Sequence, residues 1–165
     1  MHYYPNPASG LDIHEVNVAV EEAFAEYGRG KVQMPPKVYI TFEHGDFRTM
    51  PAAIPSLSIG GVKIVNVHPG NPAIGLPTVM ALTIILNPGT GIPEAILNAT
   101  ALTDLRTGAA GAIASKYLSP KKSVVLGLVG SGRQAQAQVD AISKELTIRE
   151  IRVWSRDEKN ALAFC

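Results

Sequence analysis

The sequence predicts an α/β fold, in which an α+β domain is followed by the first part of a parallel βαβ unit. Short apolar or alternating segments between residues 37 and 99 are typical of strands that pair with their neighbours in sequence. A helical stretch rich in small residues follows them. The end of the chain then reads as strand, glycine turn, helix and strand. We therefore predict one domain over residues 1–118 and a second over residues 119–165.

The first domain is predicted to begin with an amphipathic helix. Asp12 is placed to cap its first turn, Glu15 three residues later completes the pattern of a capping box, and Gly28 marks the end. An apolar stripe at helical spacing predicts the face of this helix that packs against the rest of the domain. The stripe consists of Val16, Val20, Ala23, Phe24 and Tyr27.

Five strands are predicted after this helix. "KVYITFE" (37–43) alternates, which places Lys37 and Tyr39 on one face and Val38 and Ile40 on the other. A turn at residues 44–46 leads into a returning antiparallel strand. The strands that follow the turn are "FRTMPA" (47–52), "GGVKIVNVHP" (60–69), "TVMALTIIL" (78–86) and "EAILNA" (94–99).

The second half of the sequence changes from strands to alternating helix and strand. A helix is predicted from about Thr100 to Tyr117, and its run of glycines and alanines at 108–112 would let another backbone approach closely. "SPKK" (119–122) marks the boundary between the domains. Beyond it we predict a strand over "SVVLGLV", a helix over about 134–146 and a strand over "IREIRVW".

The turn between the predicted strand "SVVLGLV" and the helix that follows it fits the G-x-G-x-x-A form of a dinucleotide-binding fingerprint. Gly130 permits the tight turn, Gly132 lets the backbone approach a pyrophosphate, and Ala135 packs the helix against the sheet. The helix N-terminus offers free N–H groups to the anion. Because the strand precedes and the helix follows, we favour dinucleotide binding over a plain turn.

The end of the following strand normally reads the ribose 2′ position of the cofactor. An acidic residue there accepts from a ribose hydroxyl, whereas a small polar residue followed by Arg suits a 2′-phosphate. Ser155 stands where the acid is expected, Arg156 follows it, and Asp157 comes slightly late. This pattern leans towards NADP, with NAD close behind.

Four cationic residues stand in positions where their charge needs an explanation. Lys63 shares a face with apolar residues, and the pattern alone favours a lysine that extends to solvent over one in a pocket. Lys37 and Arg48 flank the turn at 44–46. They would share a sheet face if its loop has four residues, and would lie on opposite faces if it has three. Arg106 lies among small residues in the middle of a predicted helix.

Composition excludes several classes of function. The chain has 165 residues and a formal net charge of +1, so it offers no basic field for nucleic acid. The opening residues do not read as a signal peptide, and no apolar run is long enough to span a membrane, so we expect a cytoplasmic protein. The single cysteine, Cys165, excludes an intramolecular disulfide. No residues stand at metal-ligand spacing, and we predict no metal site.

Several motifs together resemble those of the ornithine cyclodeaminase/mu-crystallin family, and within it those of the archaeal-type alanine dehydrogenases. The resemblance runs from about Asp12 to the end of the chain. The segments that carry it are "PPK", "FRTMPA", "VKIVNVHP", "NPAIGLPTVMAL", "LRTGAA" and "LVGSGRQAQAQ". It implies a substrate-binding and dimerisation domain joined to a Rossmann domain that binds NAD or NADP.

The resemblance also implies roles for individual residues. Lys63 would donate and accept a proton at the substrate, and Lys37 and Arg48 would hold the substrate carboxylate. Arg106 would bind near the cofactor phosphates and the substrate. The remaining cofactor-binding positions implied by the family are Gly130, Gly132, Arg133, Gln134, Ser155, Arg156 and Asp157.

Three activities are compatible with these residues. The first is reversible oxidative deamination of L-alanine to pyruvate and ammonia by an NAD(P)-dependent homodimeric enzyme. The second is conversion of L-ornithine to L-proline and ammonia. The third is NADPH binding without catalysis, as in mu-crystallin, although the Lys37, Arg48 and Lys63 set argues for chemistry.

The sequence departs from the family pattern at both ends. "MHYYPNPASG" replaces the strand-like opening that the family leads us to expect. The family also implies further Rossmann strands, a catalytic aspartate and a segment that returns to the first domain, all beyond residue 165. A single βαβ unit leaves a sheet edge and apolar faces uncovered, so we expect the chain to be truncated within its Rossmann domain.

Overall fold

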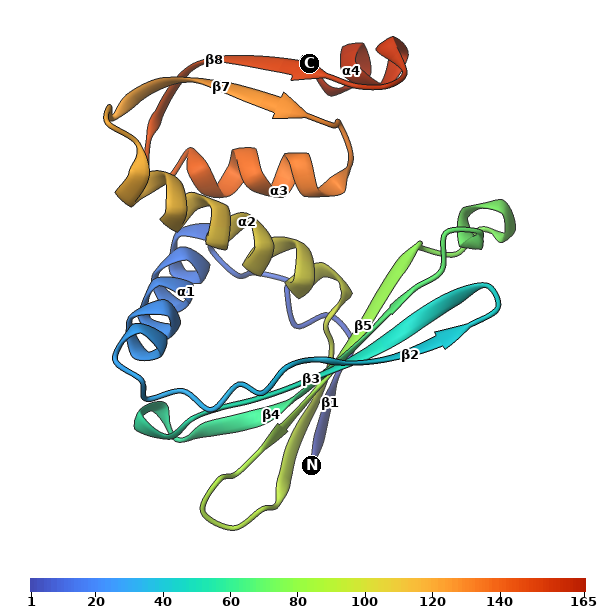
Figure 1. The fold of residues 1–165 in the computed structure, drawn as a ribbon, viewed down its shortest axis with the longest axis vertical. Helices are drawn as coiled ribbons and strands as arrows, with labels where there is room; N and C mark the ends of the chain where they lie inside the picture. Colours follow the sequence, from blue (N-terminus) through green and yellow to red (C-terminus); the bar gives the residue numbers. More distant parts are fainter. The chain divides into compact units, whose positions relative to one another are not determined.

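A computed structural model describes all of residues 1–165, and its α/β architecture confirms the predicted fold class (Figure 1). The chain forms two compact units. The first comprises Met1–Ser9 and Ala23–Thr103, and the second comprises Gly10–Glu22 and Asp104–Cys165. Each unit has its own sheet and its own core. The predicted boundary between residues 118 and 119 lies inside the second unit.

A six-stranded sheet forms most of the first unit, in the order β1-β6-β5-β4-β3-β2. Strands β2 to β6 run antiparallel to their neighbours, and β1 pairs in parallel with β6. All five predicted strands are present. The strands are β1 (His2–Tyr4), β2 (Val38–Phe42), β3 (Gly45–Ile54), β4 (Ile59–Val67), β5 (Val79–Leu86) and β6 (Pro93–Asn98).

Strand β1 corrects the expectation that the opening residues lack a strand. His2, Tyr3 and Tyr4 pair with Ala95, Ile96 and Leu97 of β6. A three-residue strand is too short to show an alternating pattern in the sequence. Its backbone is ordered by the edge of β6, which lies more than ninety residues away in the chain.

The hairpin between β2 and β3 has a shorter loop than either length considered from the sequence. Phe42 pairs with Gly45, so the loop consists of Glu43 and His44 alone. Two-residue loops match the twist of paired strands well. Because two and four are both even, Lys37 and Arg48 share a sheet face, as they would with the four-residue loop considered from the sequence.

The second unit contains a two-stranded parallel sheet and the helix that connects its strands. β7 (Ser123–Val129) leads through a glycine turn into α3 (Arg133–Ile142), and β8 (Thr147–Trp154) pairs with β7. The predicted strand–turn–helix–strand order is therefore present, although α3 ends four residues earlier than predicted. A short helix that was not predicted, α4 (Glu158–Phe164), follows β8.

Helix α1 (Ile13–Gly28) begins as predicted, because Asp12 Oδ1 accepts a hydrogen bond from the backbone N–H of His14 at 2.6 Å. Its predicted apolar face is partly wrong. Phe24 and Tyr27 are 50% and 57% exposed, whereas the two most buried residues of the helix are Asn17 and Glu26. Both are polar, so hydrophobic periodicity gives no signal for their burial.

Both buried polar side chains of α1 make hydrogen bonds, although the buried Oδ1 of Asn17 accepts none. Asn17 Nδ2 donates to the backbone oxygen of Ala141 at 3.0 Å and to Glu145 Oε1 at 2.9 Å. Glu26 accepts hydrogen bonds from Ser56 and Arg29. The first set lies within the second unit and the other lies within the first unit.

Helix α2 (Thr100–Leu118) approaches α3 closely through its glycines, as its run of small residues predicts. A Cβ atom on Gly108 would clash with the backbone oxygen of Ala137, and one on Gly111 would clash with the side chain of Gln138. At Gly108 the obstacle is backbone, so glycine is needed for this spacing, whereas at Gly111 the Gln138 side chain could move aside. The core beside the crossing consists of Ala112, Ala141, Ile142 and Leu146, with Ile13, Val124, Leu126 and Ile148 packed against it.

Candidate functional site

The pairing of the large sheet places three predicted site residues on the same face. Arg48 pairs with Val65, and Lys63 pairs with Met50, so these four side chains point to one side. Tyr39 pairs with Arg48, and Lys37 stands two residues before Tyr39. The face therefore carries the cations at 37, 48 and 63, and its buried centre consists of Val65, Ala81 and Ala99.

Tyr39 lies between two of these cations, and sequence reasoning did not identify it. Its ring centroid is 5.2 Å from Lys37 Nζ and 5.0 Å from Arg48 Cζ. At this distance the electron-rich face of an aromatic ring attracts a cation. Tyr39 therefore keeps the two positive groups close to one another on an exposed edge strand.

Asp46 holds Arg48 in a fixed orientation. Arg48 donates from Nε to Asp46 Oδ1 and from Nη2 to Asp46 Oδ2, each at 2.9 Å. This hydrogen-bonded carboxylate raises the pKa of the Arg48 guanidinium. The bidentate pair fixes the guanidinium plane and leaves Nη1 and the second hydrogen of Nη2 for an anionic ligand. The spacing of two on a strand gives the sequence signal for this pair.

Lys63 lines a cavity of about 240 Å³ on the same sheet. Thr83, which pairs with Lys63 on β5, lines it as well, and most of the other lining side chains are apolar. Lys63 therefore lies at a pocket, which is the second of the two positions considered from the sequence, the first being an extension to solvent. Lys37 and Arg48 lie on the same face but do not line this cavity.

The glycine turn of the second unit has the backbone geometry that the dinucleotide fingerprint requires. Gly130 has a φ of 110°, which only glycine adopts readily, and its N–H donates to the backbone oxygen of Trp154 at 2.7 Å. Gly132 caps α3 in an extended conformation without any side-chain cap. The N–H of Ala135 donates to the backbone oxygen of Gly132 at 2.9 Å, so the N–H groups of Arg133 and Gln134 are the ones at the start of α3 that can bind an anion.

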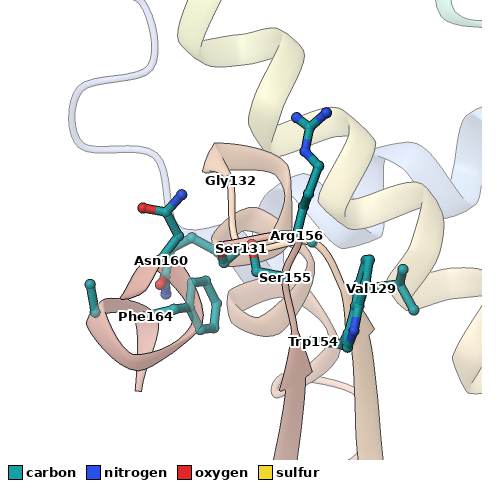
Figure 2. Close-up of a pocket in the computed structure, with 11 residues that line it drawn as sticks. Val129, Ser131, Gly132, Trp154, Ser155, Arg156, Asn160 and Phe164 are labelled. Atoms are coloured by element: carbon teal, nitrogen blue, oxygen red, sulfur yellow. Dashed lines mark hydrogen bonds between the residues drawn. The ribbon is translucent and has the colours of Figure 1, made fainter. Parts of the chain in front are cut away.

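A cavity of about 620 Å³ opens beside this turn (Figure 2). Gly130, Ser131 and Gly132 form one side, and Ser155 and Arg156 at the end of β8 also line it. The Ser131 and Ser155 hydroxyls are 3.1 Å apart and hydrogen-bonded. Figure 2 shows the exposed ring of Trp154 close to Val129 at the edge of the cavity.

Asp157 does not line this cavity. Its carboxylate instead caps α4, where Oδ1 accepts a hydrogen bond from the backbone N–H of Lys159 at 3.0 Å. The acidic group that follows β8 is thus used by the helix that it begins. Ser155 and Arg156 are the two residues of the predicted ribose-reading set that the cavity contains.

Arg133 and Gln134, predicted to bind the pyrophosphate, both contact Asp104 of α2. Arg133 Nη2 is 2.6 Å from Asp104 Oδ2, and Gln134 Nε2 donates to Asp104 Oδ1. Arg106 lies on the same helix and is exposed. Although the residue as a whole is exposed, partial burial of its guanidinium lowers the pKa of Arg106, and the charge of Asp104 opposes this shift. Sequence reasoning did not identify Asp104, because the contact depends on the crossing of α2 and α3.

The residues around the glycine turn fit a nicotinamide dinucleotide. The turn supplies backbone donors and close access for a pyrophosphate, and the cavity beside it is large enough for part of such a ligand. The residues that would hold the cofactor are Gly130, Ser131, Gly132, Ser155 and Arg156. No group of three or more His, Cys, Asp or Glu side chains that could bind a metal ion is present.

Comparison with known proteins gives a consistent result. The sequence profile of the ornithine cyclodeaminase/mu-crystallin family matches residues 8–165. An alanine dehydrogenase from Archaeoglobus fulgidus is 51% identical over 154 residues, which cover 93% of this chain and 47% of the relative. These values confirm the resemblance found in the motifs.

Two solved structures also match closely. An archaeal alanine dehydrogenase dimer with bound NAD has a TM-score of 0.93 and 49% identity over 98% of this chain and 51% of that one. Thermococcus litoralis Δ(1)-pyrroline-2-carboxylate reductase, in complex with NADH and L-proline, has a TM-score of 0.93 and 34% identity over 99% of this chain and 52% of that one. The chain spans about half the length of these relatives. None of its helices is both long and apolar enough to span a membrane.

Proposed function

We propose that the protein, which belongs to the ornithine cyclodeaminase/mu-crystallin family, is an NAD(P)-dependent amino-acid dehydrogenase. Its proposed reaction is the reversible oxidative deamination of L-alanine, with water, to pyruvate and ammonia. The relative named alanine dehydrogenase is 51% identical to this chain over 93% of the residues of this chain. The geometry of the large sheet supports the same reaction.

In this proposal the substrate carboxylate binds to Lys37 and Arg48. A planar guanidinium binds a carboxylate through two parallel hydrogen bonds, and a nearby ammonium adds a second positive charge. Asp46 fixes the Arg48 guanidinium, and the Tyr39 ring keeps Lys37 and Arg48 close enough to bind one carboxylate together. Fixing one end of a small substrate places its reacting carbon reproducibly, which is a large part of catalysis in such sites.

Lys63 is the proposed acid and base. Lys63 lines a cavity whose other lining residues are mostly apolar, which places its amino group where a small bound substrate could exchange a proton with it. In the direction of pyruvate reduction, Lys63 protonates the oxygen that leaves as water. In the reverse direction it accepts a proton from the water that adds to the imine carbon after the hydride has left the amino acid, and the resulting carbinolamine releases ammonia to give pyruvate.

The second unit is the proposed cofactor site. The glycine turn and the first N–H groups of α3 would hold the pyrophosphate, and Ser155 and Arg156 would contact the ribose. When bound, the nicotinamide accepts a hydride from the amino acid or supplies one to the imine. Since Asp157 caps α4 and Arg156 lines the cavity, the chain favours a 2′-phosphate, that is NADP, over NAD.

The observation that supports this function most strongly is the shared sheet face of Lys37, Arg48 and Lys63. The test is reduction of pyruvate in the presence of ammonium, measured by absorbance with NADH and NADPH in parallel. We expect Lys63→Met to lower kcat by about a hundredfold or more, the usual contribution of a general acid or base. Lys121→Met, in an exposed loop, should leave kcat unchanged.

The same assay with other substrates separates the alternatives. Conversion of L-ornithine to L-proline without alanine turnover would replace the dehydrogenase with a cyclodeaminase. Reduction of Δ1-pyrroline-2-carboxylate alone would indicate the activity named for the Thermococcus litoralis relative. Tight NADPH binding with no turnover of any of these substrates would favour a binding protein.

We also propose that the protein is a homodimer, as the archaeal alanine dehydrogenase structure is described. The sheet face opposite Lys63 exposes large apolar side chains on β2. Val38 is 58% exposed, and Ile40 and Phe42 are each 47% exposed. Apolar side chains grouped in this way are typical of protein interfaces. Sedimentation analysis that finds only monomers at micromolar concentration would contradict this assembly.

A further inference from the structure

The two side chains expected to bind a phosphate, Arg133 and Gln134, already donate hydrogen bonds to a carboxylate of this chain. Asp104 accepts from Arg133 through Oδ2 at 2.6 Å and from Gln134 through Oδ1. Both donors belong to the first turn of α3, directly after the Gly130–Gly132 turn. These two side chains therefore bind an anion in the structure, and this anion is part of the protein.

The position of Asp104 follows from the crossing of α2 and α3. Asp104, Thr107, Gly108 and Gly111 have the spacing of one helix face. Gly108 and Gly111 admit the backbone and side chains of α3, and Gln138 Nε2 donates to the backbone oxygen of Thr107 at 3.0 Å. The carboxylate is thus held beside α3 by contacts that do not involve Arg133.

The Arg133 side chain, in contrast, is free to exchange partners. It is 66% exposed and makes a single hydrogen bond to Asp104, which is only 21% exposed. Exposed ion pairs of this kind are weak, whereas a phosphate offers a guanidinium two parallel hydrogen bonds. A phosphate at this turn would also be repelled by the Asp104 charge.

We propose that Asp104 competes with the dinucleotide phosphates for Arg133 and Gln134 and thereby weakens cofactor binding. This inference rests on the proposed dinucleotide site and adds to it a residue that sets its affinity. Asp104 keeps the donors of the site hydrogen-bonded before the cofactor arrives. Binding then exchanges one anion for another, which lowers affinity and favours release of the product cofactor.

The experiment measures the Kd of NADH and of NADPH by fluorescence. Trp154, the only tryptophan, lines the cavity, so its quenching and its energy transfer to the reduced nicotinamide report binding without turnover. We expect Asp104→Asn to lower both Kd values about three- to fivefold, in proportion to the loss of an exposed ion pair. In an Arg133→Ala background, Asp104→Asn should change Kd much less.

Glu150→Gln is the matched control, since it removes one charge from another exposed carboxylate–arginine pair of the same unit. It should leave both Kd values unchanged. An unchanged or higher Kd in a folded Asp104→Asn protein, checked by circular dichroism, would overturn the competition but leave the dinucleotide site intact. Absence of binding by every variant and by the unmodified protein would overturn the dinucleotide site itself.

Discussion

The two units each contain an arginine paired with an aspartate, and the two pairs differ in ways that predict opposite roles. Arg48 and Asp46 are joined by two hydrogen bonds, and their side chains are 28% and 23% exposed. Arg133 and Asp104 are joined by one hydrogen bond, and the arginine is 66% exposed. A bidentate, half-buried pair fixes its guanidinium, whereas a single exposed contact is easily exchanged for another anion.

The origin of the two pairs also differs. Asp46 and Arg48 are two residues apart on β3, so the strand itself places both side chains on one face. Asp104 and Arg133 come from separate helices, and they meet because glycines allow α2 and α3 to approach. The first aspartate therefore belongs to a local motif, and the second depends on tertiary packing.

The largest expected effect comes from Gly108→Ala, which alters the helix crossing that places Asp104 beside Arg133. A Cβ at position 108 meets the backbone oxygen of Ala137, so the helices must separate. Although alanine is the better helix former, we expect the free energy of unfolding to fall by about 1–3 kcal/mol, as in other overpacked cores. Chemical denaturation followed by Trp154 fluorescence measures this change.

Gly127→Ala provides the control for this substitution. Gly127 lies in the same unit, and a Cβ there meets no atom within 4 Å. Its free energy of unfolding should change by less than about 0.5 kcal/mol. If Gly108→Ala were as stable as the unmodified protein, the close approach of the two helices would be wrong, and the position of Asp104 would lose its explanation.

A smaller effect is expected from Asp46→Asn, which weakens the bidentate pair of the first unit. The amide retains one acceptor but no longer fixes the guanidinium of Arg48 through two oxygens. We expect KM for pyruvate to rise about three- to tenfold with little change in kcat, since Arg48 holds the substrate and does not exchange its proton. Asp46→Asn and Asp104→Asn should thus change ligand affinity in opposite directions.

Steady-state kinetics with Glu43→Gln supply the reference for Asp46→Asn. Glu43 is an exposed acid in the adjoining loop, and its removal changes the net charge by the same amount. An equal rise of KM in both variants would attribute the effect to overall charge. A fall of KM in Asp46→Asn would show that this aspartate also competes with the ligand.

The smallest effects concern acid stability, because each unit holds one carboxylate of α1 whose pKa is lowered, Glu21 in the second unit and Glu26 in the first. Hydrogen bonds from Ser56 and then Arg29 lower the pKa of Glu26, and those from Lys116 and then Tyr117 lower the pKa of Glu21. A carboxylate whose pKa is lower in the folded state stabilises the fold above the unfolded-state value, near 4.5. This stability is lost as pH falls from that value through the folded-state pKa.

Ser56→Ala removes the main cause of the lowered pKa of Glu26, while Tyr117→Phe removes the lesser cause for Glu21. We expect Ser56→Ala to reduce the difference in stability between about pH 3 and pH 7 more than Tyr117→Phe does. Denaturation curves at several pH values measure it. The reverse order would assign the larger contribution to Glu21 and its partners.

Much of the fold could be predicted from the sequence, because the signals are local. Five strands follow from alternating or continuous apolar segments, and α2 and the turn at Gly130 follow from small residues at suitable spacing. The cations at 37, 48 and 63 could be named from their motifs. Whether they share a face depended on the parity of one loop, which the sequence left open.

The missed features have a common physical cause. Strand β1 forms because the edge of β6 offers it hydrogen bonds, and Asn17 is buried because Ala141 and Glu145 accept its amide hydrogens. In each case the partner is distant in the chain, so no periodicity records it. The same holds for Asp104 and its contact with Arg133.

Local sequence signals were enough to predict most of the helices and strands, the glycine turn and the types of residue available for chemistry. Local backbone preference and side-chain spacing suffice for these, since each depends on neighbours within a few positions. The position of Tyr39 beside Arg48 and the contact of Arg133 with Asp104 come from the tertiary structure instead. The first contact depends on strand pairing and the second on helix crossing. Each brings together side chains whose distance in space the sequence does not specify.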